Sequence, residues 1–216
     1  MDMMEIMKAR HSVRQYSGKK IEPEKRELLT ALAKECSRES GLNIQLLFDE
    51  PKCFDSMMAH YGKFKGVENY IALVGKKGPD LDEKAGYYGE KLVLKAQEIG
   101  LNTCWVAMTH GKSAAKIAKG EKLACIIALG YGVTQGSAHK SKTVQSLCNS
   151  PKDAPEWFAR GMEAAMLAPT AMNQQKFSFT LEKDQVTAKA GIGFYAKMDL
   201  GIVKYHFEAA TGRRVK

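Results

Sequence analysis

The chain has 216 residues, 44% of them hydrophobic and 26% charged, and 19 glycines and 6 prolines are too few for a collagen-like or low-complexity protein. This length can bury a core without metals or disulfides. The longest near-uniform apolar run covers only residues 123–129, whereas a membrane-spanning helix needs about 20 residues. The N-terminus also lacks the basic region of a targeting signal, so we expect no membrane segment and no leader.

Charge and cysteine content narrow the class further. The net charge is +9, from 33 basic and 24 acidic residues, but the lysines are scattered and are not interleaved with aromatic residues. A nucleic-acid partner therefore ranks last among the possible ligands. The five cysteines form no CxxC motif, which predicts neither a zinc site nor a disulfide framework and favours a reducing cytoplasm. No metal site is expected.

The hydrophobic pattern alternates between helical and strand periods along the chain. An amphipathic helix is expected around Met4 and Met7, and further helices are expected at 28–36, with Leu28, Leu32 and Cys36 on its apolar face, and at 81–99, 158–165 and 198–209. Strands are expected at 43–48, 70–74, 103–107, 125–129, 177–181 and 186–190. Helices and strands are therefore expected to be interleaved along the chain.

Two regions of the chain share an order of features. Pro23-Glu24 opens a helix that is followed by Asn43-Ile44-Gln45 and an apolar strand, and Pro155-Glu156 opens one that is followed by Asn173-Gln174-Gln175 and another strand. A chance arrangement would explain one such match, but a similar pairing of Gly89 and Gly100 with Gly201 and Gly212 favours duplication. We therefore expect one domain, 1–216, with pseudo-symmetric halves at about 1–135 and 140–216, joined by the loop at 130–141.

The first chemical motif is Arg10-His11-Ser12-Val13-Arg14, at the end of the N-terminal helix. Two guanidinium groups and a hydroxyl within five residues suit an anion such as phosphate, because arginine donates bidentate, permanently charged hydrogen bonds. A solvated basic helix end that complements the helix dipole is an equally simple interpretation.

The second motif is Ala168-Pro169-Thr170-Ala171-Met172-Asn173-Gln174-Gln175. Its small residues would admit a planar ligand. Asn173 and Gln175, two positions apart on an outgoing strand, would share one face and could bond the polar edge of a heteroaromatic ring. Capping and turn chemistry would use the same residue types.

With these motifs the sequence resembles the nitroreductase family of FMN-dependent oxidoreductases. RHSVRQY resembles that family's Arg-x-Ser-x-Arg/Lys flavin motif, and LAPTAMNQQKF resembles its Ala-Pro-Ser-x-x-Asn-x-Gln-Pro-Trp motif. GEKLVLKAQEIGLNTCWV and ACIIALGYG resemble the family's central helix and the strands around it. The second motif lies late in the chain, where a duplicated, nitroreductase-like subgroup would have it. The resemblance implies an α+β fold with a mixed or antiparallel sheet flanked by helices.

The resemblance implies a role for particular residues. Arg10, Ser12 and Arg14, with His11 between them, would hold the phosphate and ribityl end of FMN. Asn173 and Gln175 would contact the isoalloxazine, and Pro169, Thr170 and Ala171 would shape the wall. A backbone N–H of Val106, Ala107 or Met108 would face flavin N5, and Lys140 or Lys142 would be a further basic phosphate ligand. One flavin per chain is expected, in a monomeric pseudo-dimer or a homodimer.

The implied reaction is hydride transfer from NADH or NADPH through flavin N5 to a small acceptor, of the nitroaromatic or quinone type, by a ping-pong mechanism. No side chain is expected to act as a catalyst, because the cofactor carries the chemistry. The chain departs from the family where Lys176-Phe177 replaces Pro-Trp. The alternative is a flavin-binding protein of the same fold whose reductase function is lost or specialised.

Overall fold

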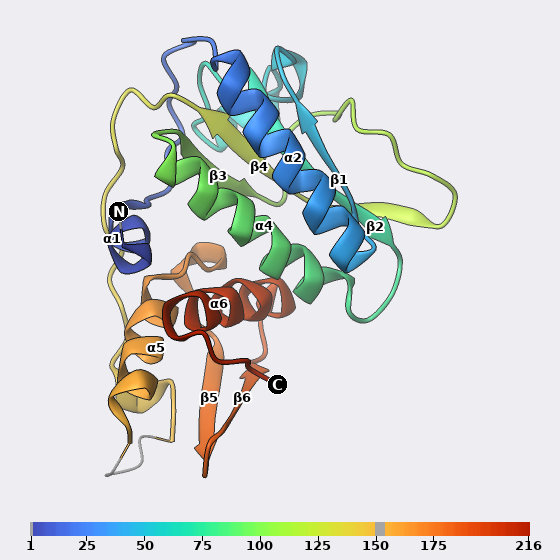
Figure 1. Ribbon diagram of the computed structural model, residues 1–216. Coiled ribbons are helices and arrows are strands. Elements are labelled where there is room, and N and C mark those ends of the chain that lie inside the picture. Colours follow the sequence, from blue (N-terminus) through green and yellow to red (C-terminus); the bar gives the residue numbers. More distant parts are fainter. Residues whose placement is uncertain (1, 150–153) are drawn as a thin grey trace. The chain divides into compact units, whose positions relative to one another are not determined.

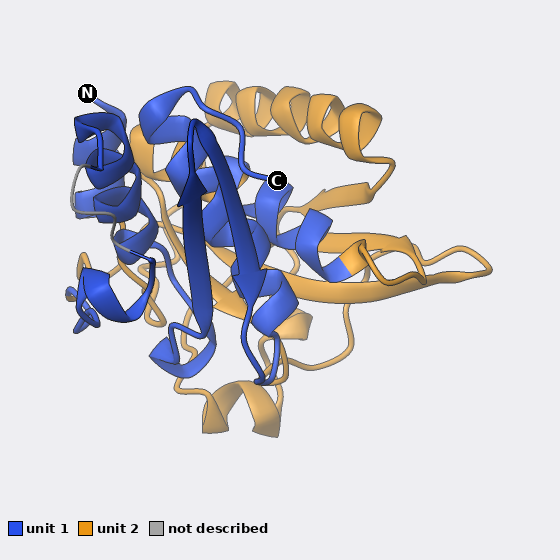
Figure 2. Cartoon of the chain, turned by 90° about the horizontal axis from the view of Figure 1, so that it is seen from below, with its two compact units in different colours: residues 1–9, 82–91, 138–216 blue, residues 10–81, 92–137 orange. Residues whose placement is uncertain are grey.

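The computed structural model describes residues 2–149 and 154–216. The chain forms two compact units, coloured separately in Figure 2. Unit 1 comprises residues 1–9, 82–91 and 138–216, and unit 2 comprises residues 10–81 and 92–137. Each unit therefore combines segments that are far apart in the sequence.

Unit 2 is built on a four-stranded antiparallel sheet of order β1-β2-β4-β3. Its elements are α2 (Pro23–Ser40), β1 (Asn43–Leu47), the short helix η1 (Pro51–Cys53), α3 (Met57–Tyr61), β2 (Asn69–Lys76), β3 (Asn102–Val106) and β4 (Glu121–Gly130). Figure 1 shows α2 lying over one face of this sheet.

The sequence explains where α2 begins and ends. Pro23 occupies the first turn, where its missing N–H costs nothing. Gly41 ends the helix in the left-handed conformation, with φ 73°, and its N–H donates to the Ser37 carbonyl. The buried face consists of Leu29, Ala33 and Cys36, whereas Leu28 is 40% exposed. Of the expected face, Cys36 is buried as predicted, whereas Leu29 and Ala33 take the buried positions expected for Leu28 and Leu32.

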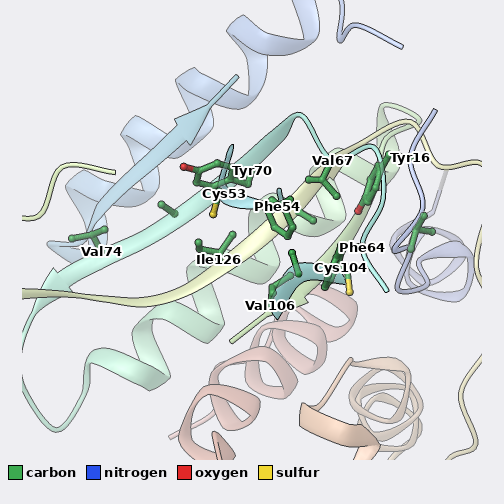
Figure 3. Packing of buried hydrophobic residues seen from close by; sticks show 14 residues of the cluster. Tyr16, Cys53, Phe54, Phe64, Val67, Tyr70, Val74, Cys104, Val106 and Ile126 are labelled. Carbon is green, nitrogen blue, oxygen red and sulfur yellow. The ribbon is translucent and has the colours of Figure 1, made fainter. Parts of the chain in front are cut away.

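One cluster of buried residues in unit 2 lies on one face of the sheet. Tyr70, Ala72 and Val74 alternate along β2, as a strand period of two requires, and they pack with Cys104 and Val106 of β3. The other cluster members are Val13, Tyr16, Cys53, Phe54, Ala59, Phe64, Val67, Ile126 and Ala128. In Figure 3 the side chains of Cys53, Phe54 and Tyr70 lie together beside β2. β2 is buried on both faces along nearly its whole length, as an inner strand of this sheet.

Unit 1 is largely helical and carries one β-hairpin. It contains α1 (Met3–Ala9), η2 (Val144–Ser146), α5 (Glu156–Leu167), η3 (Ala171–Asn173), the antiparallel strands β5 (Phe177–Glu182) and β6 (Gln185–Ala190), and α6 (Ala196–Thr211). α4 (Leu81–Glu98) contributes residues 82–91 to this unit and its last residues to unit 2.

Glycines bring the helices of unit 1 into close contact. A Cβ at Gly201 of α6 would lie 1.9 Å from the Glu83 carbonyl oxygen of α4, and one at Gly86 of α4 would lie 2.0 Å from the Met198 carbonyl oxygen. Only glycine permits this backbone approach. On the other side of α6, Phe207 stacks on Phe179 of β5 with ring centroids 5.2 Å apart. α6 is therefore the rigid centre of unit 1.

The fold class predicted from the sequence is confirmed as a mixed α+β arrangement of antiparallel sheets flanked by helices. The helices and strands expected from periodicity are present, with ends that differ by a few residues. The division into halves at about 1–135 and 140–216 stays a prediction. The internal duplication stays a prediction. Within the described residues no helix is long and apolar enough to cross a membrane.

Candidate functional site

The Arg10–Arg14 segment lies along β3 in unit 2. Ser12 pairs with Thr103 in a parallel bridge, and the Val13 N–H donates to the Thr103 carbonyl at 3.0 Å. The Arg14 carbonyl accepts a bond of 3.0 Å from the Lys65 N–H. Backbone hydrogen bonds therefore fix the segment on both sides.

The three polar residues predicted to bind phosphate gather around one buried thiol. Burial raises the pKa of Cys104, while Arg14, the hydroxyl of Ser12 and Arg10 act in the opposite direction. The thiol is neutral at physiological pH, because its ordinary pKa is already above 8. The Cys104 thiol therefore adds no negative charge beside the two guanidinium groups. Of the two, Arg10 is 4% exposed and Arg14 is exposed.

The segment predicted to face the flavin N5 atom follows on the same strand. Val106 is buried, Ala107 is half-buried and Met108 is 67% exposed. Thr103, the partner of Ser12, lies three residues before Val106, which corresponds to about 10 Å along a strand. Unit 2 therefore brings the Arg/Ser motif and the end of β3 together. His11 lies beside Gly136. A Cβ added at Gly136 would lie 2.8 Å from the Cβ of His11.

The second motif forms a loop in unit 1, which we call the 169–175 loop. Met172, Asn173 and Gln175 have φ values of 51°, 53° and 46°, and β5 begins only at Phe177. The expectation that Asn173 and Gln175 share the face of an outgoing strand is wrong. Their side-chain amides bond to each other and to the backbone of residues 140–142, in place of lying along a strand.

A hydrogen-bond network joins this loop to residues 140–142. Gln175 Nε2 donates to the Lys140 carbonyl and to Asn173 Oδ1, both at 2.8 Å, and Gln175 Oε1 accepts from the Lys142 N–H at 2.8 Å. Asn173 Nδ2 donates to the same Lys140 carbonyl at 2.9 Å, and Lys142 Nζ donates to the Gln175 carbonyl at 3.0 Å. Four predicted site residues are therefore brought together in one unit.

The two amides differ in what they have left to offer a ligand. Gln175 is 3% exposed and has used both amide N–H groups and one oxygen lone pair within the protein. Asn173 is exposed, and each of its amide atoms makes one of the hydrogen bonds given above. Asn173 therefore has one N–H and one oxygen lone pair that these bonds do not use.

Sequence reasoning missed Asp199, in the first turn of α6. This carboxylate is 2% exposed, and it accepts hydrogen bonds from the Ala171 N–H at 2.9 Å and from Gln174 Nε2 at 2.7 Å. Burial raises the pKa of Asp199 to about 6, against the opposing effect of these two bonds. The only sequence signal was an acidic residue near a helix start, which is common on solvated helices.

Pro169 and Thr170 are half-buried, and the Thr170 hydroxyl accepts a bond of 3.1 Å from the Gln175 N–H. Ala171 is held by Asp199 as described. These residues form the rest of the 169–175 loop. The described part of the chain holds no group of three His, Cys, Asp or Glu side chains that could bind a metal ion.

Unit 2 also contains a cavity of about 640 Å³. Phe54, Phe64 and Val67 form its apolar part, and Asp55 and Lys63 are among its polar residues. None of the predicted site residues lines it.

The comparison with protein families gives one match over nearly the whole chain. Residues 2–211 match a family model described as "Putative TM nitroreductase". The sequence matches none of the curated proteins with which it was compared.

Solved structures with the same fold include three that differ in how much of the chain they match. One is described as "a putative nitroreductase" from Thermotoga maritima, with 21% identity and a TM-score of 0.72 over 97% of this chain and 83% of that one. An FMN-dependent nitroreductase from Clostridium difficile has 18% identity and a TM-score of 0.51, covering 70% and 97%. "A putative nitroreductase in complex with FMN" from Desulfovibrio desulfuricans has 16% identity and a TM-score of 0.55, covering 71% and 98%.

Proposed function

This chain belongs to the nitroreductase family, and we propose that it is an FMN-dependent oxidoreductase that passes hydride from NADH or NADPH to a small acceptor of the nitroaromatic or quinone type. Two structures with the same fold are described as FMN-dependent or as a complex with FMN, which supports this choice of cofactor. The residues of both motifs also have the chemistry that FMN requires.

The phosphate end of the cofactor needs cationic and hydroxyl donors. Arg10, Ser12 and Arg14 supply them, gathered around the neutral thiol of Cys104. Guanidinium groups bind phosphate bidentately, and a hydroxyl suits a remaining phosphate oxygen or a ribityl hydroxyl. His11 lies within the same segment. In this proposal these residues bind the phosphate and ribityl part of FMN.

The isoalloxazine edge alternates donors and acceptors. Asn173 has one N–H and one oxygen lone pair left over, so it could donate to or accept from a group on such an edge. Gln175 could accept at most one hydrogen bond from the flavin, and its other bonds hold Asn173 and residues 140–142 in place. Pro169, Thr170 and Ala171 form the small-residue wall, and Lys140 and Lys142 add positive charge near the loop.

When bound, FMN would supply the two-electron chemistry. The end of β3 would orient it, because a backbone N–H of Val106, Ala107 or Met108 can donate a hydrogen bond toward N5. The lysines and arginines would favour the anionic reduced form electrostatically. We assign no catalytic side chain. Donor and acceptor would use the same face in turn, as a ping-pong mechanism requires. Location in the cytoplasm and a monomeric or homodimeric state stay predictions.

The observation that carries this proposal is the gathering of two guanidinium groups and a hydroxyl beside β3. The test is an absorbance spectrum after addition of FMN and removal of the excess, followed by anaerobic NADH and then NADPH. Retained flavin that is bleached by either nicotinamide supports the reductase. Retained flavin that neither bleaches supports the alternative, a flavin-binding protein with lost or specialised reductase function. Absence of retained flavin contradicts both.

A further inference from the structure

The 169–175 loop has an unfavourable backbone. Three of its residues that are not glycine, Met172, Asn173 and Gln175, have positive φ values between 46° and 53°. Such conformations are disfavoured for residues with a Cβ and persist only where the surroundings hold them. Asn173 tolerates this region well, but methionine and glutamine do not. Some other part of unit 1 must therefore fix the loop.

Asp199 is placed to do this from a rigid element. Its two carboxylate oxygens accept separate hydrogen bonds, Oδ1 from the Ala171 N–H and Oδ2 from Gln174 Nε2. These two partners flank Met172 and Asn173. Gln174 Nε2 also donates to the Phe194 carbonyl at 2.7 Å. The Asp199 N–H itself donates to the Tyr195 carbonyl at 2.9 Å, in the first turn of α6.

We propose that Asp199 is a positioning residue for flavin binding: through Ala171 and Gln174, its ionised carboxylate holds the 169–175 loop in the backbone conformation that presents Asn173 to the cofactor. The inference rests on the function proposed above. It gives a role to a buried charge that is otherwise unfavourable in this position.

The carboxylate form is the one that fits both partners. Each partner is a donor, so an ionised carboxylate can accept from both, whereas a protonated one turns an O–H toward a donor. Burial opposes ionisation and raises the pKa of Asp199 to about 6. As the pH falls through this value, the carboxylate takes up a proton and can no longer accept hydrogen bonds from both Ala171 and Gln174. Both hydrogen bonds to Asp199 are therefore present at neutral pH, and the loop is held less firmly in mild acid.

Nearby charges do not account for this behaviour. Burial raises the pKa of Asp199, and the hydrogen bonds from Gln174 and Ala171 lower it. Other titratable groups on α6 and on the elements packed against it pair with one another and not with Asp199. These pairs are Glu83 with Lys204, Glu90 with His206, Tyr87 with Glu208, Lys8 with Glu163, and Arg160 with Asp2. The hairpin adds Glu182 and Lys189, and the first turn of α6 adds Lys197.

The test compares flavin affinity across pH in wild type and D199N. Dissociation constants are measured by quenching of flavin fluorescence between about pH 5 and about pH 8. Riboflavin is titrated beside FMN, because the FMN phosphate itself titrates near pH 6. For wild type, riboflavin affinity should fall as the pH drops through about 6. For D199N it should be about tenfold weaker at neutral pH and should not change over this range. D184N, at the exposed hairpin turn, is the matched control.

A second measurement needs neither flavin nor a variant. The amide proton of Ala171 should shift with an apparent pKa of about 6 in an NMR titration of the wild-type chain without cofactor. A flat Ala171 resonance, or D199N with wild-type riboflavin affinity and pH profile, overturns the positioning role while leaving the flavin proposal intact. A wild-type chain that binds neither flavin overturns both. Equal loss of affinity in D184N and D199N would also contradict it.

Discussion

The two groups of candidate site residues are held in place by different means. In unit 2, Ser12 and its neighbours are fixed by backbone bonds to Thr103 and Lys65, so their position does not depend on which side chains they carry. In unit 1, the 169–175 loop is fixed by the side chains of Gln174, Gln175 and Asp199. The first arrangement should tolerate side-chain substitution and pH, and the second should not.

The largest effect is expected from removing both guanidinium groups of unit 2. R10A/R14A should weaken FMN binding about a hundredfold to ten-thousandfold, because each charged hydrogen bond is worth about 1.5–3 kcal/mol. The loss should be much smaller for riboflavin, which lacks the phosphate. Fluorescence titration with both ligands measures it.

R38A is the control, since Arg38 is exposed at the end of α2. Because the backbone bonds of the segment remain, circular dichroism of the double variant should match wild type. Equal losses for FMN and riboflavin would show that the arginines do not bind the phosphate.

The next effect is a pH dependence of stability that belongs to unit 1. The pKa of Asp199 is raised to about 6 from an ordinary 3.8, so between these values the folded chain binds a proton that the unfolded chain has lost. The free energy of unfolding should therefore fall as the pH rises through this window, by about 3 kcal/mol.

The difference between wild type and D199N isolates this contribution, because other groups titrate alike in both. Urea unfolding at several pH values measures it. D199N should be less stable than wild type below about pH 4 and should gain relative to it as the pH rises to about 6. A difference that is constant with pH would mean that Asp199 has an ordinary pKa.

The sequence predicted unit 2 better than the 169–175 loop, for a physical reason. Strands such as β2 and helices such as α2 follow from periodicity, which reports local burial. The conformation at Asn173 and Gln175 depends on Lys140, more than thirty residues away, and no periodicity records such a contact. Asp199 carried only the signal of an acidic first turn. The pairing of Ser12 with Thr103 is likewise a long-range contact that no local pattern records, although the arginines themselves were recognisable as a motif.

A smaller effect is expected at Gln175. Q175L keeps the volume but leaves the Lys142 N–H and the Lys140 carbonyl without this partner, so unfolding should cost about 2 kcal/mol less. Flavin affinity should fall about tenfold, since Asn173 loses its support. Q185L, at an exposed position of the hairpin, should change neither quantity. Unchanged flavin affinity in Q175L would show that the hydrogen bonds of Gln175 do not contribute to flavin binding.

The smallest effect concerns backbone strain at two exposed methionines, one in each unit. Met172 is 81% exposed with φ 51°, whereas Met57 is 84% exposed within the helix α3. M172G should raise the free energy of unfolding by about 0.5 kcal/mol, because relief of a left-handed methionine outweighs the entropy that glycine loses. M57G should lower it by about 0.5–1 kcal/mol, the ordinary cost of glycine in a helix. Thermal and urea unfolding of both variants measures these changes.

Each substitution removes the same solvent-exposed side chain, so changes of opposite sign in the free energy of unfolding must come from the backbone. Changes of equal sign would mean that the loop at Met172 carries no strain for Asp199 to hold.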